Sequence, residues 1–203
     1  MGISLQKGQK IDLTKGGGLR QVMVGLGWDE AQQKGGLFKN ILGSQPQNID
    51  CDASAILCGA DGKIVSNEIK QCCVYFGNLR HSSGAIVHQG DNLTGAGDGD
   101  DEQIMVNLSQ IPSDVHKIVF VVNIYDARQR KQHFGMIQNA FIRLVNMDHN
   151  TEICRYNLSE NYHNMTGLVV GEIYRKNGEW KFNAIGQPVQ EASRLDSLIR
   201  LYQ

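Results

Sequence analysis

The sequence predicts an all-β fold, an antiparallel β-sandwich with a few short helices, and three observations lead to that prediction. Runs of β-branched and aromatic residues recur at intervals of roughly ten residues, the spacing typical of short strands in sandwiches. Turn signals stand between them, among them Asn177-Gly178, and Asn-Gly favours a tight hairpin turn with positive φ at both positions. Twenty-three glycines against three prolines fit a fold with many turns. Because strands and helices do not alternate, a doubly wound α/β fold is the weaker alternative.

Six segments are strand-like because β-branched and aromatic residues dominate them. They are residues 20–28, 103–108, 117–126, 139–145, 167–174 and 179–186. A seventh segment, 49–57 (IDCDASAIL), fits an alternating strand. Asp61-Gly62 and the corner at 148–150 are further turn signals.

Two segments depart from the strand pattern. Residues 30–48 are polar and glycine-containing but hold Leu37, Phe38, Ile41 and Leu42. We expect a surface insertion whose apolar residues fold onto the sandwich; a partner-docking element is the alternative. The tail 190–203 places four apolar residues on one helical stripe: Leu195, Leu198, Ile199 and Tyr202. This pattern predicts a helix that packs on the core, with an oligomerisation helix as the alternative. The predicted organisation is one domain over 1–188 and a helical tail over 189–203.

Composition excludes several classes of protein. No run approaches the roughly 18 apolar residues of a membrane span, and the start lacks the apolar core of a signal peptide. Five cysteines without a CxxC pair argue against a disulfide framework and a zinc site, so we expect a cytoplasmic protein. The net charge is −1 and no basic patch is visible, which argues against a nucleic-acid binder.

The acidic charge is concentrated between His81 and His116, where six acidic residues occur without Lys or Arg. Within this stretch, residues 91–102 read DNLTGAGDGDDE, with four carboxylates in the last five positions. Carboxylates and backbone carbonyls on a glycine-rich loop are the ligands that Ca²⁺ prefers, and the loop has no His or Cys for a soft metal. It is not an EF-hand, because Leu93, Gly95 and Ala96 occupy positions that need oxygen ligands or the turn glycine. A solvated acidic turn is the alternative.

A second acidic group strengthens the calcium prediction. Asp50 and Asp52 lie two apart, so on a strand both would face the same side. Asp29 follows Trp28 at a predicted strand end. If these three residues meet the 91–102 loop at one end of the sandwich, their carboxylates would surround a site suited to more than one cation. The alternative for Asp50 and Asp52 is a pair of exposed strand residues.

Catalytic motifs are not found. The sequence has no GxSxG, HExxH, HxH or Walker A motif. His133 and His163 have polar neighbours and are expected at the surface, and Cys72-Cys73 is expected in a strand or the core. Non-enzymatic binding is therefore the first hypothesis, and a metal-dependent hydrolase (phosphoesterase-like) that uses the carboxylates is the alternative.

Several segments together resemble the TerD/TerZ family of bacterial tellurium-resistance and general stress proteins. The match spans about residues 3–188, with the 30–48 segment closer to the TerZ branch, and its most specific part is GDNLTGAGDGDDE at 90–102. Other matching segments are VGLGWD at 24–29, IDCDASAIL at 49–57, PSDVHKIVFVVNIYDA at 112–127 and GEIYRKNGEWKFNAIGQ at 171–187.

The resemblance implies a β-sandwich that binds Ca²⁺, usually two ions, between acidic loops. It implies a calcium-dependent binding or scaffold module that works with other stress or tellurium-resistance proteins at or near the inner face of the membrane. Asp98 falls at a spacer position of the motif. Carried over by position, the ligands would be Asp29, Asp50, Asp52, Asp91, Asn92, Asp100, Asp101 and Glu102, with carbonyls from Gly95 and Gly97.

Overall fold

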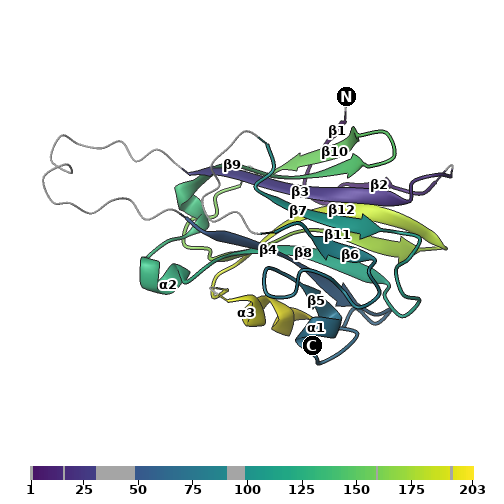
Figure 1. Cartoon of the computed structure of the whole chain (residues 1–203). Helices are drawn as coiled ribbons and strands as arrows, with labels where there is room; N and C mark the ends of the chain where they lie inside the picture. Colours follow the sequence, from purple (N-terminus) through teal and green to yellow (C-terminus); the bar gives the residue numbers. More distant parts are fainter. Residues whose placement is uncertain (1, 16, 31–48, 91–98, 159, 193) are drawn as a thin grey trace, which may run out of the picture.

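Two six-stranded sheets pack face to face in the computed structural model of the chain, which confirms the predicted sandwich (Figure 1). The structure describes residues 2–15, 17–30, 49–90, 99–158, 160–192 and 194–203. Predictions for 31–48 and 91–98, including the surface insertion, concern residues outside this described set.

The first sheet has β3 (Gln21–Glu30) near its centre and the strand order β1-β10-β9-β3-β7-β6. Its other strands are β1 (Ile3–Leu5), β10 (Thr151–Asn157), β9 (Ile137–Asn146), β7 (Glu102–Asn107) and β6 (Ile86–His88). All neighbours are antiparallel except β1 and β10, which pair in parallel at the edge of the sheet.

The second sheet is antiparallel throughout, with the order β2-β12-β11-β8-β4-β5. Its strands are β2 (Lys10–Asp12), β12 (Glu179–Val189), β11 (Gly167–Lys176), β8 (Lys117–Ile124), β4 (Cys51–Cys58) and β5 (Cys73–Val74). The β11–β12 hairpin turns at Asn177 and Gly178, whose φ angles of 54° and 78° are the positive values that the Asn-Gly signal predicts.

Side-chain alternation divides each strand between two environments. On β4, Cys51, Ala53 and Ala55 belong to the apolar core between the sheets, whereas Ile56 and Cys58 belong to a second cluster on the outer face. This alternation fixes where the acidic residues of β4 point, because Asp52 and Ser54 share the outer face with Ile56.

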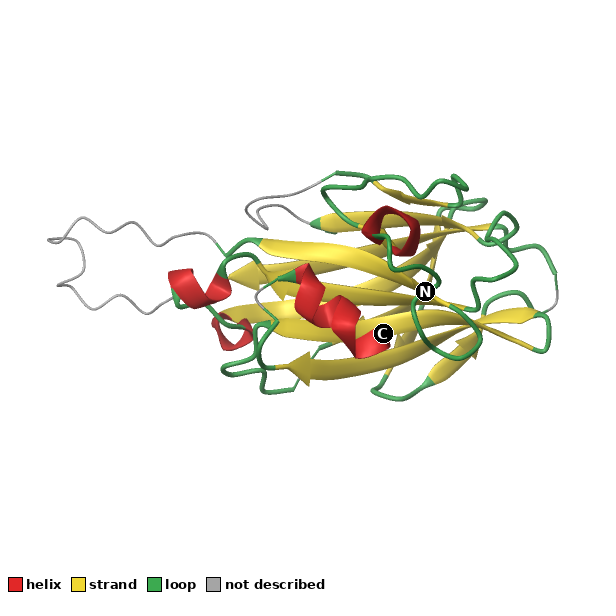
Figure 2. Cartoon of the chain, turned by 90° about the horizontal axis from the view of Figure 1, so that it is seen from below, coloured by secondary structure: helices red, strands yellow, loops and turns green. Residues whose placement is uncertain are grey.

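The helices are short and lie outside the two sheets. They are α1 (Ile69–Cys72), α2 (Ala127–Arg130) and α3 (Leu195–Ile199), with 3₁₀ turns η2 (Phe134–Met136) and η3 (Arg200–Tyr202). Figure 2 shows α3 lying across the outer face of a sheet. There Leu198 and Ile199 are buried against Val119, Val121 and Val169, which confirms the prediction of a helix that packs on the core. No helix among the described residues is long and apolar enough to cross a membrane.

Removing the Leu198 side chain should test how strongly α3 is anchored. Leu198 is fully buried, so Leu198→Ala should lower the free energy of unfolding by about 2–4 kcal/mol through lost burial and the cavity left behind. Urea denaturation measures this change. The matched control is Leu201→Ala, because Leu201 is 49% exposed and should change stability by no more than about 0.5 kcal/mol. Equal effects of the two variants would show that the helix is not docked.

Candidate cation site

The end of β3 and the start of β4 lie at the same end of the sandwich (Figure 1). The start of β7 joins them, because β3 and β7 are antiparallel and Leu26 pairs with Glu102. Six of the ten predicted ligands are described in this region: Asp29, Asp50, Asp52, Asp100, Asp101 and Glu102. The other four, Asp91, Asn92, Gly95 and Gly97, lie outside the described residues.

Residues 99–101 cross over β3 where two glycines leave room. A Cβ atom on Gly25 would collide with the Asp100 carboxylate, and one on Gly27 would lie 2.6 Å from the Gly99 carbonyl oxygen. The Asp101 backbone N–H donates to the Leu26 carbonyl at 2.8 Å, and the Trp28 N–H donates to Asp101 Oδ2 at 2.7 Å. The glycines of the VGLGWD motif therefore permit close approach of a second segment, a use of strand glycines that the sequence analysis missed.

Asp100 forms the strongest ion pair of this crossing segment. Arg143 on β9 donates from Nε to Oδ1 at 2.7 Å and from Nη2 to Oδ2 at 2.9 Å, the two-pronged geometry that Arg forms best with carboxylates. The Asp100 side chain has no solvent exposure, and its hydrogen bond raises the pKa of Arg143. Sequence reasoning missed Arg143, because only the pairing of β9 with β3 brings it here.

Asp29 and Asp101 lie close enough to affect each other. Burial raises the pKa of the Asp101 carboxyl, the Trp28 N–H opposes that rise, and the charges of Asp29 and Asp100 add to it. Asp29 accepts a hydrogen bond of 2.7 Å from the Asn139 side chain. Asn139 has a φ of 53°, a left-handed conformation that asparagine tolerates better than most residues.

Glu102 points into the core and contacts a buried histidine. Its Oε2 atom lies 2.8 Å from Nε2 of His88, and both side chains are 1% exposed. Nε2 of His88 also lies 3.2 Å from the Ala53 carbonyl oxygen, while Nδ1 accepts from the Gly90 N–H. In the neutral ring the proton is therefore on Nε2, where it joins β6, β7 and β4 across the two sheets. His88 was not among the predicted site residues.

Asp50 and Asp52 flank Cys51 at the start of β4. Asp52 is only 6% exposed and accepts a hydrogen bond of 3.2 Å from Asn123 on β8, while Asp50 lies 3.7 Å from Nη1 of Arg130. Burial raises the pKa of the Cys51 thiol well above its usual value, and Asp52, Asp50, Asp101 and Glu102 add to the rise. Acidic residues of both sheets are thus within electrostatic range of one buried side chain.

The structure gathers the six described carboxylates at one end but directs them differently. Asp29, Asp100 and Asp101 lie along the end of β3, Glu102 faces the core, and Asp52 faces the outer side of β4. Among the described residues, no three His, Cys, Asp or Glu side chains form a group that could hold a metal ion. The complete ligand set, with Asp91, Asn92, Gly95 and Gly97, stays a prediction.

Breaking the Asp100–Arg143 pair should be costly. Arg143→Met leaves a buried carboxylate without its cation, and loss of one partner of a buried pair costs about 3–5 kcal/mol. Because the Arg143 side chain is 28% exposed, we expect a loss somewhat below that range, about 2–3 kcal/mol, in urea denaturation. Asp100→Asn combined with Arg143→Met should recover part of the loss.

The control for this prediction is the ion pair of Lys7 with Glu160, whose side chains are 46% and 44% exposed. Lys7→Met should change stability by less than about 1 kcal/mol. An Arg143→Met variant as stable as Lys7→Met would contradict the anchoring role.

Comparisons with known proteins agree with the resemblance in the sequence. The family model described as TerD domain matches residues 1–202. The chain is 52% identical over its full length, and over the full length of the relative, to Stress response protein SCP2 of Bacillus subtilis (strain 168). It is 45% identical to Tellurium resistance protein TerD of Serratia marcescens, covering 92% of this chain and 91% of that protein.

A solved structure shares the fold. It is the crystal structure of a homologue of telluride resistance protein (TerD) from Streptomyces coelicolor A3(2), with a TM-score of 0.59 and 20% identity, covering 86% of this chain and 92% of that one. The relatives above are named as stress and resistance proteins rather than as enzymes.

Proposed function

This chain belongs to the TerD family, and we propose that it is a non-enzymatic Ca²⁺-binding module of the stress and tellurium-resistance response. The observation that supports the proposal best is the convergence of Asp29, Asp100 and Asp101 at the end of β3, where burial raises the pKa of Asp101 and the charges of Asp29 and Asp100 add to the rise. Carboxylates held this close repel one another, and a divalent cation relieves that repulsion.

The proposed ligands divide into two roles. Asp29, Asp50, Asp52, Asp101 and Glu102 would supply carboxylates, together with Asp91, Asn92, Gly95 and Gly97. Asp100 forms an ion pair with Arg143, so we propose that Asp100 fixes the position of residues 99–101. A direct contact between Asp100 and the cation remains a prediction. Oxygen ligands in this number favour Ca²⁺ over Mg²⁺, and a set with room for two ions accords with the ion count that the resemblance implies.

Binding rather than catalysis is favoured by the state of Cys51 and His88, two side chains of reactive types near the acidic end. A metal-dependent hydrolase needs an accessible nucleophile or base beside an open coordination position. Cys51 is fully buried and the pKa of its thiol is raised, which disfavours the reactive thiolate. His88 is 2% exposed and is held by Glu102, Ala53 and Gly90. Neither side chain is placed to reach a substrate.

The calcium-loaded end is also the part of the protein that we propose for contact with other stress or tellurium-resistance proteins, in the cytoplasm or at the inner membrane surface. The names of the relatives support the response in which the protein acts. Calcium would act here by fixing the positions of the acidic loops, so that a partner recognises the loaded form.

Asp101→Asn should have opposite effects without and with calcium. A carboxyl whose pKa is raised on folding opposes folding once it ionises, so this cost appears as the pH rises through the folded pKa. In EGTA at pH 7 the variant should therefore melt about 1–3 °C higher than the parent chain, and the difference should vanish in acid. In millimolar calcium it should melt lower, because one ligand has lost its charge.

The control is Asp148→Asn in the exposed β9–β10 turn, which should have the same small effect in EGTA and in calcium. Scanning calorimetry of both variants under the two conditions measures the melting temperatures. A calcium response of Asp101→Asn equal to that of the parent chain would remove Asp101 from the proposed ligand set.

A further inference from the structure

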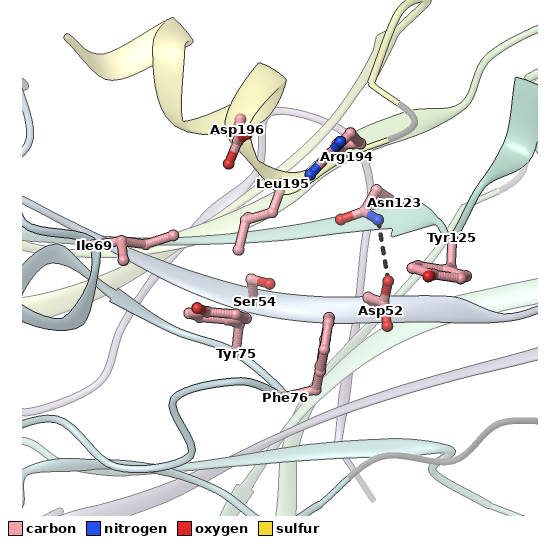
Figure 3. A pocket seen from close by; sticks show the side chains of 10 residues that line it. All are labelled: Asp52, Ser54, Ile69, Tyr75, Phe76, Asn123, Tyr125, Arg194, Leu195 and Asp196. Atoms are coloured by element: carbon pink, nitrogen blue, oxygen red, sulfur yellow. Dashed lines mark hydrogen bonds between the residues drawn. The ribbon is translucent and has the colours of Figure 1, made fainter.

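A pocket of about 220 Å³ opens on the outer face of β4 and β8, between the first turn of α3 and the turn at residues 75–76. Figure 3 shows the side chains that line it. Asp52, Ser54 and Asn123 form its floor, and they are 6%, 1% and 2% exposed. Because one water needs only roughly 15 Å³ of such space, the pocket has room for a small organic molecule.

Two buried polar atoms of the floor form no hydrogen bond within the described part of the chain. They are the hydroxyl oxygen of Ser54 and the side-chain carbonyl oxygen of Asn123. The amide nitrogen of Asn123 donates to Asp52 at 3.2 Å, which fixes the amide, because the flipped group would set its oxygen against a carboxylate. Buried polar atoms are nearly always paired in native proteins. The two atoms therefore indicate that the pocket holds a molecule that forms hydrogen bonds.

The two unpaired atoms come from neighbouring strands. Asp52 pairs with Asn123 and Ser54 pairs with Val121, so Ser54 and Asn123 are diagonal neighbours on one face, with Cα atoms roughly 7–8 Å apart. The carbonyl of Asn123 only accepts a hydrogen bond, whereas the hydroxyl of Ser54 donates or accepts one. A ligand with two neighbouring polar groups, at least one of them a donor, can satisfy both atoms at once.

The charged residues of the lining carry both signs. Asp52 and Asp196 contribute carboxylates, and Arg194 contributes a guanidinium. A charged ligand of either sign therefore meets a like charge, which costs affinity. Carboxylates accept hydrogen bonds and a guanidinium only donates them. A neutral ligand whose groups both donate and accept suits this lining, and hydroxyl groups do both.

Aromatic and aliphatic side chains complete the lining. Phe76 and Tyr125 are 46% and 42% exposed, so their rings are open to contact at the mouth. Tyr75, Ile69 and Leu195 also line the pocket. Aromatic rings contribute large apolar contact area. A sugar ring has C–H faces for such contact and hydroxyls on neighbouring carbons, and it loses less conformational freedom on binding than a linear polyol.

We propose that this pocket binds a single ring of an uncharged sugar. One hydroxyl of the sugar would donate to the Asn123 carbonyl oxygen, its neighbour would exchange a hydrogen bond with Ser54, and a C–H face would pack on Phe76. This binding does not depend on calcium. Because Asp52 is also a proposed calcium ligand, the measurements are made in EGTA.

The probes are the methyl glycosides of glucose, galactose, mannose and xylose, and the matched control is methyl tetrahydropyranyl ether, which has the same ring without hydroxyls. In amide NMR titrations at least one glycoside should bind with a dissociation constant of about 5 mM or tighter. The control should bind at least tenfold more weakly. The shifts should localise to residues 52–54, 75–76 and 121–123. If no glycoside binds, or the ether binds equally well, the proposal is overturned and water is the occupant of the floor.

Variants then test the residues with the glycoside that binds best. Ser54→Ala should weaken its binding about three- to tenfold, the value of one neutral hydrogen bond. The same variant should be no less stable than the parent chain, because the Ser54 hydroxyl has no described partner to lose. Phe76→Ser should weaken binding by a similar factor. Leu79→Ser is the control, because Leu79 is 44% exposed and lies outside the pocket lining.

Two results with these variants would contradict the assignment. One is unchanged binding to Ser54→Ala, and the other is an effect of Leu79→Ser as large as that of Phe76→Ser.

A last arm distinguishes a free sugar from one that ends a longer chain. A disaccharide in which the same ring is linked to a second one should bind no more tightly than the methyl glycoside, since the pocket has room for little beyond one ring. At least tenfold tighter binding of the disaccharide would overturn the assignment to a free monosaccharide and make the pocket a site for the end of a glycan.

Discussion

Repulsion between carboxylates is the constraint that shapes one end of this molecule. β3, β4 and β7 bring six acidic side chains to that end, and the described structure gives each of them a polar neighbour. Arg143 holds Asp100, Asn139 holds Asp29 and Asn123 holds Asp52, while Asp101 accepts from a backbone amide and Glu102 lies against His88. Hydrogen bonds orient these groups, and Arg143 and Arg130 bring positive charge to Asp100 and Asp50. In the proposal, a bound cation would further relieve the repulsion between the carboxylates.

The crossing of β3 by residues 99–101 links the fold to this site. The crossing needs two strand glycines, since a Cβ at Gly25 or Gly27 would occupy the space of the crossing segment. The buried ion pair of Asp100 then fixes its position. On the other side of β4, Asp52 faces the pocket of Figure 3 together with Ser54 and Asn123. One short strand therefore contributes Asp52 both to the proposed calcium ligands and to the lining of this pocket.

Local patterns predicted much of this fold. Asn177-Gly178 predicted the β11–β12 turn, and the stripe of Leu195, Leu198 and Ile199 predicted the helix at the C-terminal end. The strand-like runs predicted the long central strands. The very short edge strands, such as β1 and β5, carry too few residues for a pattern. The partners of the acidic residues could not be predicted either. Arg143 and Asn123 reach them only through pairing of strands that are distant in sequence, and His88 reaches Glu102 only through the register of β6 with β7. The acidic motifs predicted where charge gathers but not how it is oriented.

The most direct measurement is the melting temperature of the unmodified chain in EGTA, in magnesium and in calcium. A ligand present at a hundredfold excess over its dissociation constant stabilises the folded state by about 2.7 kcal/mol, so calcium should raise the melting temperature by roughly 5–10 °C. Magnesium should raise it less, because it requires tighter octahedral geometry, and added salt should recover only the part due to screening. Identical melting in EGTA and in millimolar calcium would contradict the proposal that a cation neutralises the acidic end.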